Sequence, residues 1–342
     1  MSEPVSTVRG FTRGSSRGRI ASIECLRMLA MFEIVSFHTS TPERLPILGG
    51  LGLPIFLLLT TAFSVVASSS RGADAVVRVK VRRLGSAWLF WCAVYSAYLV
   101  AVAVRHGAPP FAGFEPMMLF YGTADHLWFA PFAIVACVVA ANAQSWWGGA
   151  FTRRHVVVLV AVGLGGAGLA GLIPLSLPFG QWVFALPSIP LGIALGVAAQ
   201  SGDRRLLWRT VVVLAALAVF AELFAVRLDP ATGESLRRYT VAASLVLACF
   251  LWPGRANPWV DRFAAYVPGV YFVHILVRDT AHPIVAGGVV IAGCIVFTLS
   301  MLVVELLQRT PLRAMLLLRT RAKLRVPDAL PAPSVALDAR LR

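Results

Sequence analysis

The feature that most limits how this chain can fold is its series of long apolar segments. A transmembrane helix needs roughly 20 mostly apolar residues, and about ten stretches of the chain approach or meet that length. Inside a bilayer the backbone polar groups must be satisfied within the chain, so such stretches fold as helices. We therefore expect an all-α, polytopic integral membrane protein. The expected spans are residues 20–41, 46–68, 85–104, 126–143, 155–174, 179–199, 206–226, 237–253, 264–282 and 284–307.

The composition agrees with this class of protein. Hydrophobic residues make up 58% of the 342 residues and charged residues only 14%, with a mean hydropathy of +0.76. An ordinary soluble domain carries about 25% charged residues. A soluble helical core is the alternative, but its helices would need hydrophilic faces, which these segments lack.

The distribution of Lys and Arg predicts the orientation. With the N-terminus in the cytoplasm, the inner segments hold 24 of the 31 basic residues, the outer segments hold 6, and Arg27 lies within the first apolar segment. Cytoplasmic loops of membrane proteins carry such an excess. We expect both termini in the cytoplasm and the protein in the inner (plasma) membrane. The net charge of +15 then faces anionic lipid, and no nucleic-acid partner is expected.

The two ends of the chain differ from the apolar part. Residues 1–19 are rich in Ser, Gly and Arg, and we expect a disordered cytoplasmic tail. Residues 309–342 are basic and rich in Pro and Ala, which predicts a second, largely disordered cytoplasmic tail around a membrane domain of residues 20–308. The five Cys all fall inside apolar segments without metal-ligand spacing, so we expect no metal site.

Arg27 and His38 stand out within the first apolar segment. A step of eleven residues is close to three helical turns, so both side chains lie on nearly the same face, about 16 Å apart along the axis. Charged and titratable groups at membrane depth usually face a cavity or a pathway. Glu24 precedes Arg27 by three residues, at ion-pairing spacing. The alternative is an Arg that extends to the interface and a harmless interfacial His.

The spacing of these residues resembles the first helix of the membrane acyltransferase-3 family, in which Arg-x10-His follows an acidic-x-x-Arg motif. The resemblance runs from about residue 20 to about residue 308. Four further blocks follow in the family's order: Pro54–Phe63, Lys80–Trp88, His126–Phe132 with its His-Leu-Trp motif, and Val270–Val277 with its Tyr-x-x-His motif. The block Pro54–Phe63 ends in Thr-Thr-Ala-Phe where the family has Ser-Gly-Phe. The block Lys80–Trp88 has Lys80-x-x-Arg83 in place of Arg-x-x-Arg, and Ser86 in place of Pro.

The resemblance implies O-acylation of a carbohydrate hydroxyl by cytoplasmic acyl-CoA, usually acetyl-CoA. It places His38 at the chemistry, either as general base on the hydroxyl or as the group that first accepts the acyl unit. Arg27, paired with Glu24, would orient the acyl donor. The implied acceptor is a cell-envelope polysaccharide, a lipid-linked sugar or a glycosylated small molecule.

The resemblance also suggests where the cofactor binds. Lys80, Arg82 and Arg83 lie where the chain re-enters the membrane from the cytoplasm, and they are the candidates for the phosphates of coenzyme A. The guanidinium group of Arg binds phosphate oxygens through two parallel hydrogen bonds. Lys80 keeps the positive charge of the family's Arg but cannot form this pair of bonds. The usual excess of Lys and Arg in the cytoplasmic segments of membrane proteins also explains such a basic cluster, without any role in cofactor binding.

The remaining polar residues of the apolar segments have less specific roles. His126 and Trp128 are candidates to line the acceptor side, although Trp128 also fits an interfacial aromatic belt. We expect His274 to make a structural hydrogen bond rather than to act in catalysis. Glu33 lies well off the face shared by Arg27 and His38, and we expect it to pair within the bundle.

A different class of protein remains open at this point. Intramembrane Arg, His and Glu residues also occur in proton-coupled transporters of small solutes or glycoconjugates. The sequence shows no inverted repeat and no pair of broken helices, which are typical of transporters. We therefore favour an acyltransferase over a transporter.

Overall fold

The structure is a computed structural model, and within the part it describes every regular element is a helix. This confirms the all-α prediction. The predicted tail of residues 1–19 and most of the predicted C-terminal tail lie outside the described residues. The described residues are 20–39, 50–147, 151–173, 175–201, 204–227, 230–255, 257–281 and 289–316.

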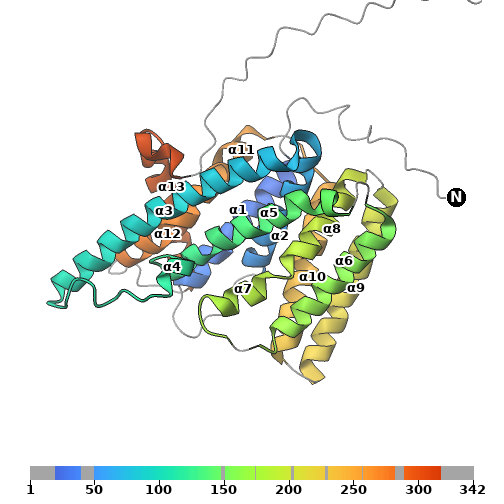
Figure 1. The fold of residues 1–342 in the computed structure, drawn as a ribbon, viewed down its shortest axis with the longest axis horizontal. Coiled ribbons are helices and arrows are strands. Elements are labelled where there is room, and N and C mark those ends of the chain that lie inside the picture. The colour runs from blue at the N-terminus through green and yellow to red at the C-terminus, as the bar shows by residue number, and fades with distance from the viewer. Residues whose placement is uncertain are drawn as a thin grey trace, which may run out of the picture.

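The helices follow the predicted apolar segments closely (Figure 1). In chain order they are α1 (Ala21–Thr39), α2 (Gly52–Arg71), α3 (Ala73–Arg105), α4 (Met118–Tyr121), the 3-10 turn η1 (Asp125–Trp128), α5 (Phe129–Trp146), α6 (Arg153–Ala170), α7 (Phe179–Ala185), α8 (Ser188–Ser201), α9 (Arg204–Arg227), α10 (Pro230–Leu251), α11 (Pro258–Ala264), α12 (Val267–Ala281), α13 (Val289–Leu307) and the 3-10 turn η2 (Pro311–Ala314).

Several of these helices are long and apolar enough to cross a membrane. Among the described residues, five stretches qualify by length and composition: α2, α3, η1 with α5, α7 with α8, and α13. Helices α11 and α12, bent by 49° at their break, qualify together as a sixth. The chain is therefore a membrane protein. The other predicted spans also form helices, as α1, α6, α9 and α10, but ten crossings remain a prediction.

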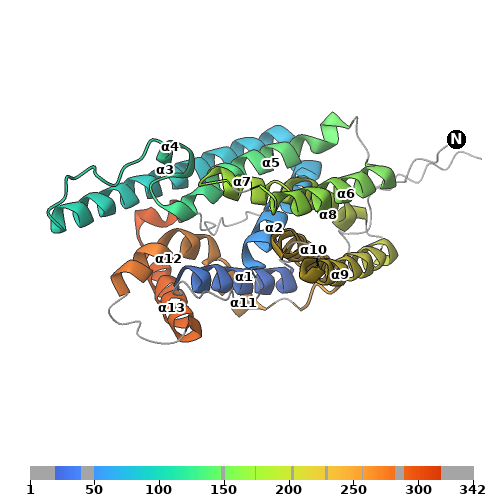
Figure 2. The ribbon, with the colours of Figure 1, turned by 90° about the horizontal axis from the view of Figure 1, so that it is seen from below.

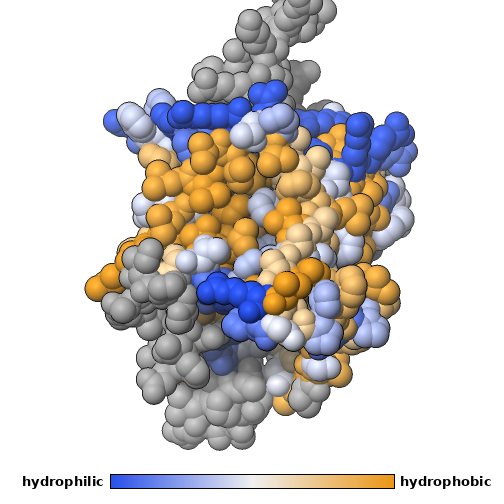
Figure 3. All heavy atoms as spheres, turned by 90° about the vertical axis from the view of Figure 1, so that its left-hand side faces the viewer, coloured by the Kyte–Doolittle hydropathy of each residue, from blue (hydrophilic) through white to orange (hydrophobic). Residues whose placement is uncertain are grey.

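The surface carries the band expected of a membrane protein. Figure 3 shows, on one face of the molecule, a broad apolar zone between two hydrophilic zones. Large apolar side chains are exposed on several helices, including Leu89 of α3 and Leu302 of α13. In water such a surface would be costly, whereas in lipid it needs no partner.

Helix α3 is much longer than the predicted span of residues 85–104. It begins at Ala73 and has 33 residues, or about 50 Å, against a bilayer core of about 30 Å. Gly72, with φ of 80°, ends α2 and turns the chain directly into α3. The basic segment therefore forms the first part of the helix rather than a loop before it. A prediction based on apolarity ended the span where the charges begin.

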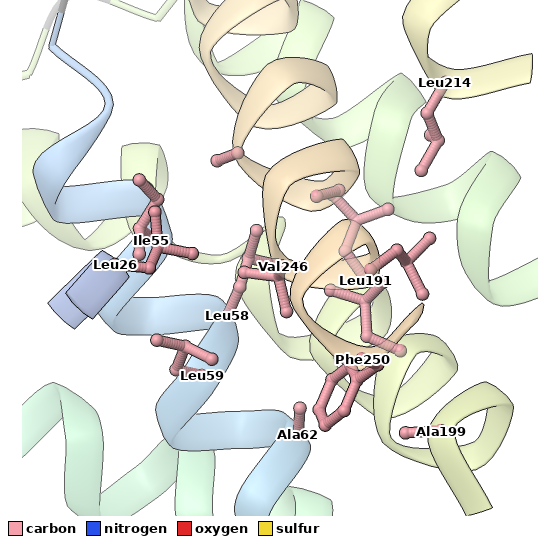
Figure 4. Close-up of a cluster of buried hydrophobic side chains, with 14 of the residues drawn as sticks. Leu26, Ile55, Leu58, Leu59, Ala62, Leu191, Ala199, Leu214, Val246 and Phe250 are labelled. Atoms are coloured by element: carbon pink, nitrogen blue, oxygen red, sulfur yellow. The ribbon is translucent and has the colours of Figure 1, made fainter. Parts of the chain in front are cut away.

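Helix α2 holds the middle of the bundle. Figure 2 shows it between one group with α3, α5, α6 and α8 and another with α1, α9, α10 and α12, and α1, α5, α8 and α10 all pack against it. Its apolar side chains join the largest buried cluster (Figure 4). That cluster includes Leu26, Ile55, Leu58, Leu191, Val246 and Phe250.

Two glycines let α8 lie close against α2. A Cβ atom at Gly192 would come within 2.5 Å of the Thr61 side chain, and one at Gly196 within 2.7 Å of the Ala62 carbonyl oxygen. Gly192 and Gly196 are four residues apart, the small-xxx-small spacing that brings membrane helices into contact. In the same interface the Thr61 hydroxyl donates to the carbonyl of Ser188 at 3.1 Å.

We expect Gly196→Ala to destabilise the protein by about 1–3 kcal/mol, because the added methyl group must displace backbone. Gly165→Ala is the matched control, since a Cβ there meets no atom within 4 Å. It should be neutral or stabilising by up to about 1 kcal/mol, because Ala favours the helix. Thermal unfolding in detergent would measure both. Equal melting temperatures for the two variants would contradict the close α2–α8 packing.

The first residues of the predicted C-terminal tail are packed against the membrane domain. The indole of Trp91 in α3 donates to the carbonyl of Met315 at 3.0 Å, and Leu316 is fully buried. Residues 309–316 therefore belong structurally with α3, α12 and α13, and residues 317–342 lie outside the described part of the chain.

Candidate active site

Helix α1 carries the predicted Arg27–His38 pair. Arg27 donates to the carboxylate of Glu24 at 2.7 Å, which confirms the ion pair expected from the spacing. The Glu24 side chain is largely buried, and that of Arg27 is 25% exposed. His38 lies in the last turn of the helix. Since α1 is continuous, the two side chains are about 16 Å apart along its axis.

Three imidazole rings from three elements meet beside the end of α1. The ring centroids of His38 and His274, on α12, are 5.3 Å apart. The ring centroids of His126, on η1, and His274 are 5.1 Å apart. His126 is 4% exposed and His274 is fully buried, whereas His38 is half-buried, so this histidine cluster extends from the interior of the bundle towards its surface. The sequence separates these residues by 88 and 148 positions, and only the fold brings them together.

His274 is fixed by its own helix. Its Nδ1 atom lies 2.8 Å from the carbonyl oxygen of Tyr271 and 3.3 Å from that of Val270. Within the described part of the chain its Nε2 atom has no hydrogen-bond partner. Buried polar atoms in native proteins are nearly always paired, so Nε2 of His274 is available to a water molecule or a ligand.

Helix α12 also holds the backbone of α1 at this point. The guanidinium of Arg278 donates to the carbonyl of His38 at 3.1 Å and pairs with the carboxylate of Asp279 at 2.5 Å. The hydroxyl of Tyr271 donates to the carbonyl of His126. Residues 271, 274 and 278 share one face of the helix, so a single stripe of α12 contacts both other members of the histidine cluster.

Helix α3 closes the other side of the histidine cluster. The ring of Tyr95 lies 5.2 Å from that of His126, centroid to centroid. Its hydroxyl donates to the carbonyl of Phe272 at 2.8 Å and accepts from the amide of Leu276 at 3.3 Å, across one turn of α12. One turn earlier on α3, the ring of Trp91 stacks on that of Phe272, with the ring centroids 5.8 Å apart. These contacts fix the position of α12 and thereby of His274.

The comparison with protein families identifies the chemistry that such a site serves. A family model described as an acyltransferase domain matches residues 20–307. The chain belongs to the acyltransferase-3 family. It is therefore a membrane acyltransferase, and the transporter interpretation falls away. No curated protein matches the chain, and no solved structure matches it.

The acyltransferase holds Glu33 at a structural position. Its carboxylate accepts from the amides of Gly50 at 2.7 Å, Leu51 at 3.2 Å and Gly52. These are orphan amides at the start of α2, where a negative charge is favourable. Among the described residues, Glu33 thus binds backbone amides rather than a charged side chain. Helix α2 begins at Gly52 rather than at the predicted residue 46, and residues 46–49 lie outside the described residues.

The basic residues predicted for the cofactor are not part of the histidine cluster. Arg82 and Arg83 are exposed and Lys80 is half-buried, all on the first part of α3. Lys80 precedes Tyr95 by fifteen residues, which is about 22 Å along the helix. Helix α3 therefore connects a basic surface at its N-terminal end with the buried site. Arg82 also lines a shallow surface depression with Asp74 and Arg78.

The two residues predicted for the acceptor side are separated by the fold. His126 lies in the histidine cluster, whereas Trp128 is buried in an aromatic group with Phe129 and Phe132. In the described part of the chain no ring contact joins Trp128 to a histidine. The role of Trp128 at the acceptor side therefore stays a prediction, while His126 is beside His274.

Sequence reasoning missed the contribution of α12. It expected a structural hydrogen bond from His274, and the contacts of Nδ1 with the carbonyls of Tyr271 and Val270 confirm it. It gave no role to Tyr271 or Arg278, although their spacing of three and four residues from His274 marks one helical face. That periodicity was the available signal. No group of three His, Cys, Asp or Glu residues in the described ranges is placed to hold a metal ion.

Proposed function

We propose that this acyltransferase moves an acyl group, in the simplest case acetyl, from cytoplasmic acyl-CoA to a hydroxyl group of a carbohydrate acceptor. The observation that carries the proposal is the position of His38. It lies at one end of α1, in ring contact with His274, and Arg27 lies about three turns away on the same helix. The extended pantetheine arm of coenzyme A has a length comparable to the separation of Arg27 and His38 along the helix axis.

His38 is suited to activate the acceptor. Imidazole has an ordinary pKa near neutral pH, which suits a general base. His38 takes the proton of the hydroxyl group, and the oxygen attacks the thioester carbonyl carbon. The carbon–sulfur bond then breaks, the ester bond forms, and the proton passes to the thiolate so that free coenzyme A leaves. In the covalent alternative His38 itself first carries the acyl group, and the same atoms balance over two steps.

Arg27 is suited to orient the donor. Its guanidinium is a planar fork that matches phosphate oxygens or polarises a carbonyl, and the ion pair with Glu24 directs it. Lys80, Arg82 and Arg83 bind the phosphates of the nucleotide at the exposed end of α3. His126 lies on the acceptor side of the histidine cluster. The acceptor is a cell-envelope polysaccharide, a lipid-linked sugar or a glycosylated small molecule.

The orientation required by this proposal places the N-terminal end of α3 in the cytoplasm, because acyl-CoA is a cytoplasmic metabolite. Single cysteines at Ser70 and Gly113, both exposed, report the two ends of α3. In a variant without the five native cysteines, we expect a membrane-impermeant thiol reagent to label Gly113→Cys in intact cells. Ser70→Cys should react only after lysis. The reverse pattern would contradict both the orientation and the assignment of Lys80, Arg82 and Arg83.

Radiolabelled acyl-CoA tests the proposed reaction. Membranes that contain the protein are incubated with acetyl-CoA labelled in the acetyl group, and the carbohydrate fraction is then separated. The proposal predicts label in this fraction as an ester that mild alkali releases, and none in membranes without the protein. Label that resists alkali, as an amide would, or label confined to protein and lipid would contradict the carbohydrate O-acylation.

A further inference from the structure

The ion pair of Arg278 and Asp279 lies near the C-terminal end of α12 and is partly exposed. The two side chains are 33% and 26% exposed, whereas His274, one turn earlier, is fully buried. Adjacent residues of a helix point in different directions, so the two side chains must turn towards one place to form this pair. Ionisable residues in a membrane-spanning helix usually face a site or a pathway.

The ion pair contacts the helices on either side of α12. Towards α1, Nη1 of Arg278 donates to the carbonyl of His38 at 3.1 Å. Towards α3, the hydroxyl of Tyr98 interacts with the carboxylate of Asp279. Tyr98 follows Tyr95 by three residues, and the hydroxyl of Tyr95 bonds to the preceding turn of α12. Arg278 and Asp279 therefore lie between α1 and α3, beside the end of α1 that carries His38.

The three side chains offer both kinds of hydrogen-bonding group. Nε and Nη2 of Arg278 both contact Oδ1 of Asp279, at 2.7 and 2.5 Å, so the ion pair does not use Oδ2. A carboxylate has about four lone pairs and a guanidinium has five N–H donors. The contacts with the His38 carbonyl and with Tyr98 use only part of this capacity. Tyr98 adds a half-buried aromatic ring.

A sugar ring is the ligand that matches this combination. Each sugar hydroxyl both donates and accepts hydrogen bonds, so neighbouring hydroxyls bind a carboxylate and a guanidinium together. The C–H face of the ring packs against an aromatic side chain. Because the opposite charges of Arg278 and Asp279 cancel, the group favours an uncharged sugar. The carboxylate of an acidic sugar would meet that of Asp279.

We infer that Arg278, Asp279 and Tyr98 bind a neutral sugar ring of the acceptor and hold one of its hydroxyl groups at His38. The hydrogen bond from Arg278 to the His38 backbone connects this sugar-binding site to the base. Arg27 lies about three turns away along α1, so the donor and the acceptor reach His38 from different directions. The inference rests on the proposed function, in which His38 acts on a carbohydrate hydroxyl.

Binding of simple sugars tests the site without acyl-CoA. The protein is placed in lipid nanodiscs, because many detergents carry sugar head groups, and saturation-transfer NMR is recorded with methyl glycosides of glucose, galactose, mannose and N-acetylglucosamine. We expect a signal from at least one of them with the wild type, and its loss in Asp279→Asn and Tyr98→Ala. Methyl glucuronide and methyl galacturonide should bind more weakly. Glu115→Gln, at an exposed position between α3 and α4, is the control and should bind like the wild type.

Steady-state kinetics separate sugar binding from a structural role of the ion pair. Asp279→Asn keeps an oxygen that accepts from Arg278, so the anchor to the His38 backbone is preserved. We expect the KM for the best-bound methyl glycoside to rise at least about tenfold, as for the loss of one hydrogen bond to a charged group. The KM for acetyl-CoA should stay within about twofold of wild type. A purely structural ion pair would instead lower kcat and leave the acceptor KM unchanged.

The two measurements distinguish the possible failures. The inference would be overturned if no neutral glycoside gave a signal with the wild type, or if Asp279→Asn and Tyr98→Ala left both the signal and the acceptor KM unchanged. If the neutral glycosides bind and both variants lose them, but no acyl transfer occurs, the sugar-binding site stands and the proposed function fails.

Discussion

Replacing His38 with Ala is expected to lower acyl transfer at least about 100-fold while the protein still inserts and folds, because loss of a general base usually costs 10²–10⁴-fold. The substitution removes the ring that contacts His274. It keeps the hydrogen bond from Arg278, because that bond uses the backbone carbonyl of His38. Initial rates of transfer from acyl-CoA, measured in membranes at matched protein levels, would give the effect.

A second histidine serves as the control for His38. His106 is exposed just beyond the end of α3, away from the histidine cluster, and His106→Ala should retain full activity. If His38→Ala kept more than about a tenth of wild-type turnover, His38 would be neither base nor acyl acceptor.

Arg27→Lys is expected to lose most activity even though it keeps the positive charge. A planar contact to a phosphate or a thioester needs the guanidinium fork, which an ammonium group does not supply. A residue that only anchors the helix in the membrane needs charge alone. Arg27→Ala should be at least as damaging. Acyl-transfer assays at equal protein levels would compare the three proteins.

Two further variants sharpen the test of Arg27. Glu24→Gln removes the charge that pairs with Arg27 at 2.7 Å, and we expect it to impair activity less than either Arg27 substitution. Arg105→Lys, at the exposed end of α3, is the control and should be without effect. An Arg27→Lys enzyme as active as wild type would make Arg27 a topology anchor. The donor site would then have to be sought at Lys80 and Arg83.

The sequence predicts most of the helices and part of the site, because both depend on local patterns. Apolar runs mark the helices, and a step of eleven residues along one helix determines the placement of Arg27 and His38. The ion pair of Glu24 with Arg27 likewise needs only i, i+3 spacing, and the structure confirms it.

The parts that the sequence does not predict depend on contacts between distant segments. The approach of His274 and His126 to His38 requires α12 and η1 to pack beside the end of α1. A buried histidine in an apolar segment looks the same whether it packs alone or beside two others. The role of Glu33 at the start of α2 similarly depends on the contact of the Gly50 amide with α1.

The length of α3 shows a different limit. Apolarity marks the part of a helix that lies in lipid, but a helix continues wherever its backbone bonds continue. Residues 73–84 carry several charges and still belong to α3. For this reason the phosphate-binding candidates lie on a helix surface rather than in a loop.

The most direct measurement uses the purified protein in sealed liposomes. Labelled acetyl-CoA is supplied on the side that carries the basic end of α3, and carbohydrate acceptor is enclosed on the other side. If the protein is the proposed O-acyltransferase, label appears as an ester on the enclosed carbohydrate, and His38→Ala liposomes show almost none. The proposed function would be contradicted if wild-type and His38→Ala liposomes both left acetyl-CoA intact and the carbohydrate unlabelled, whichever side of the membrane received the acyl-CoA.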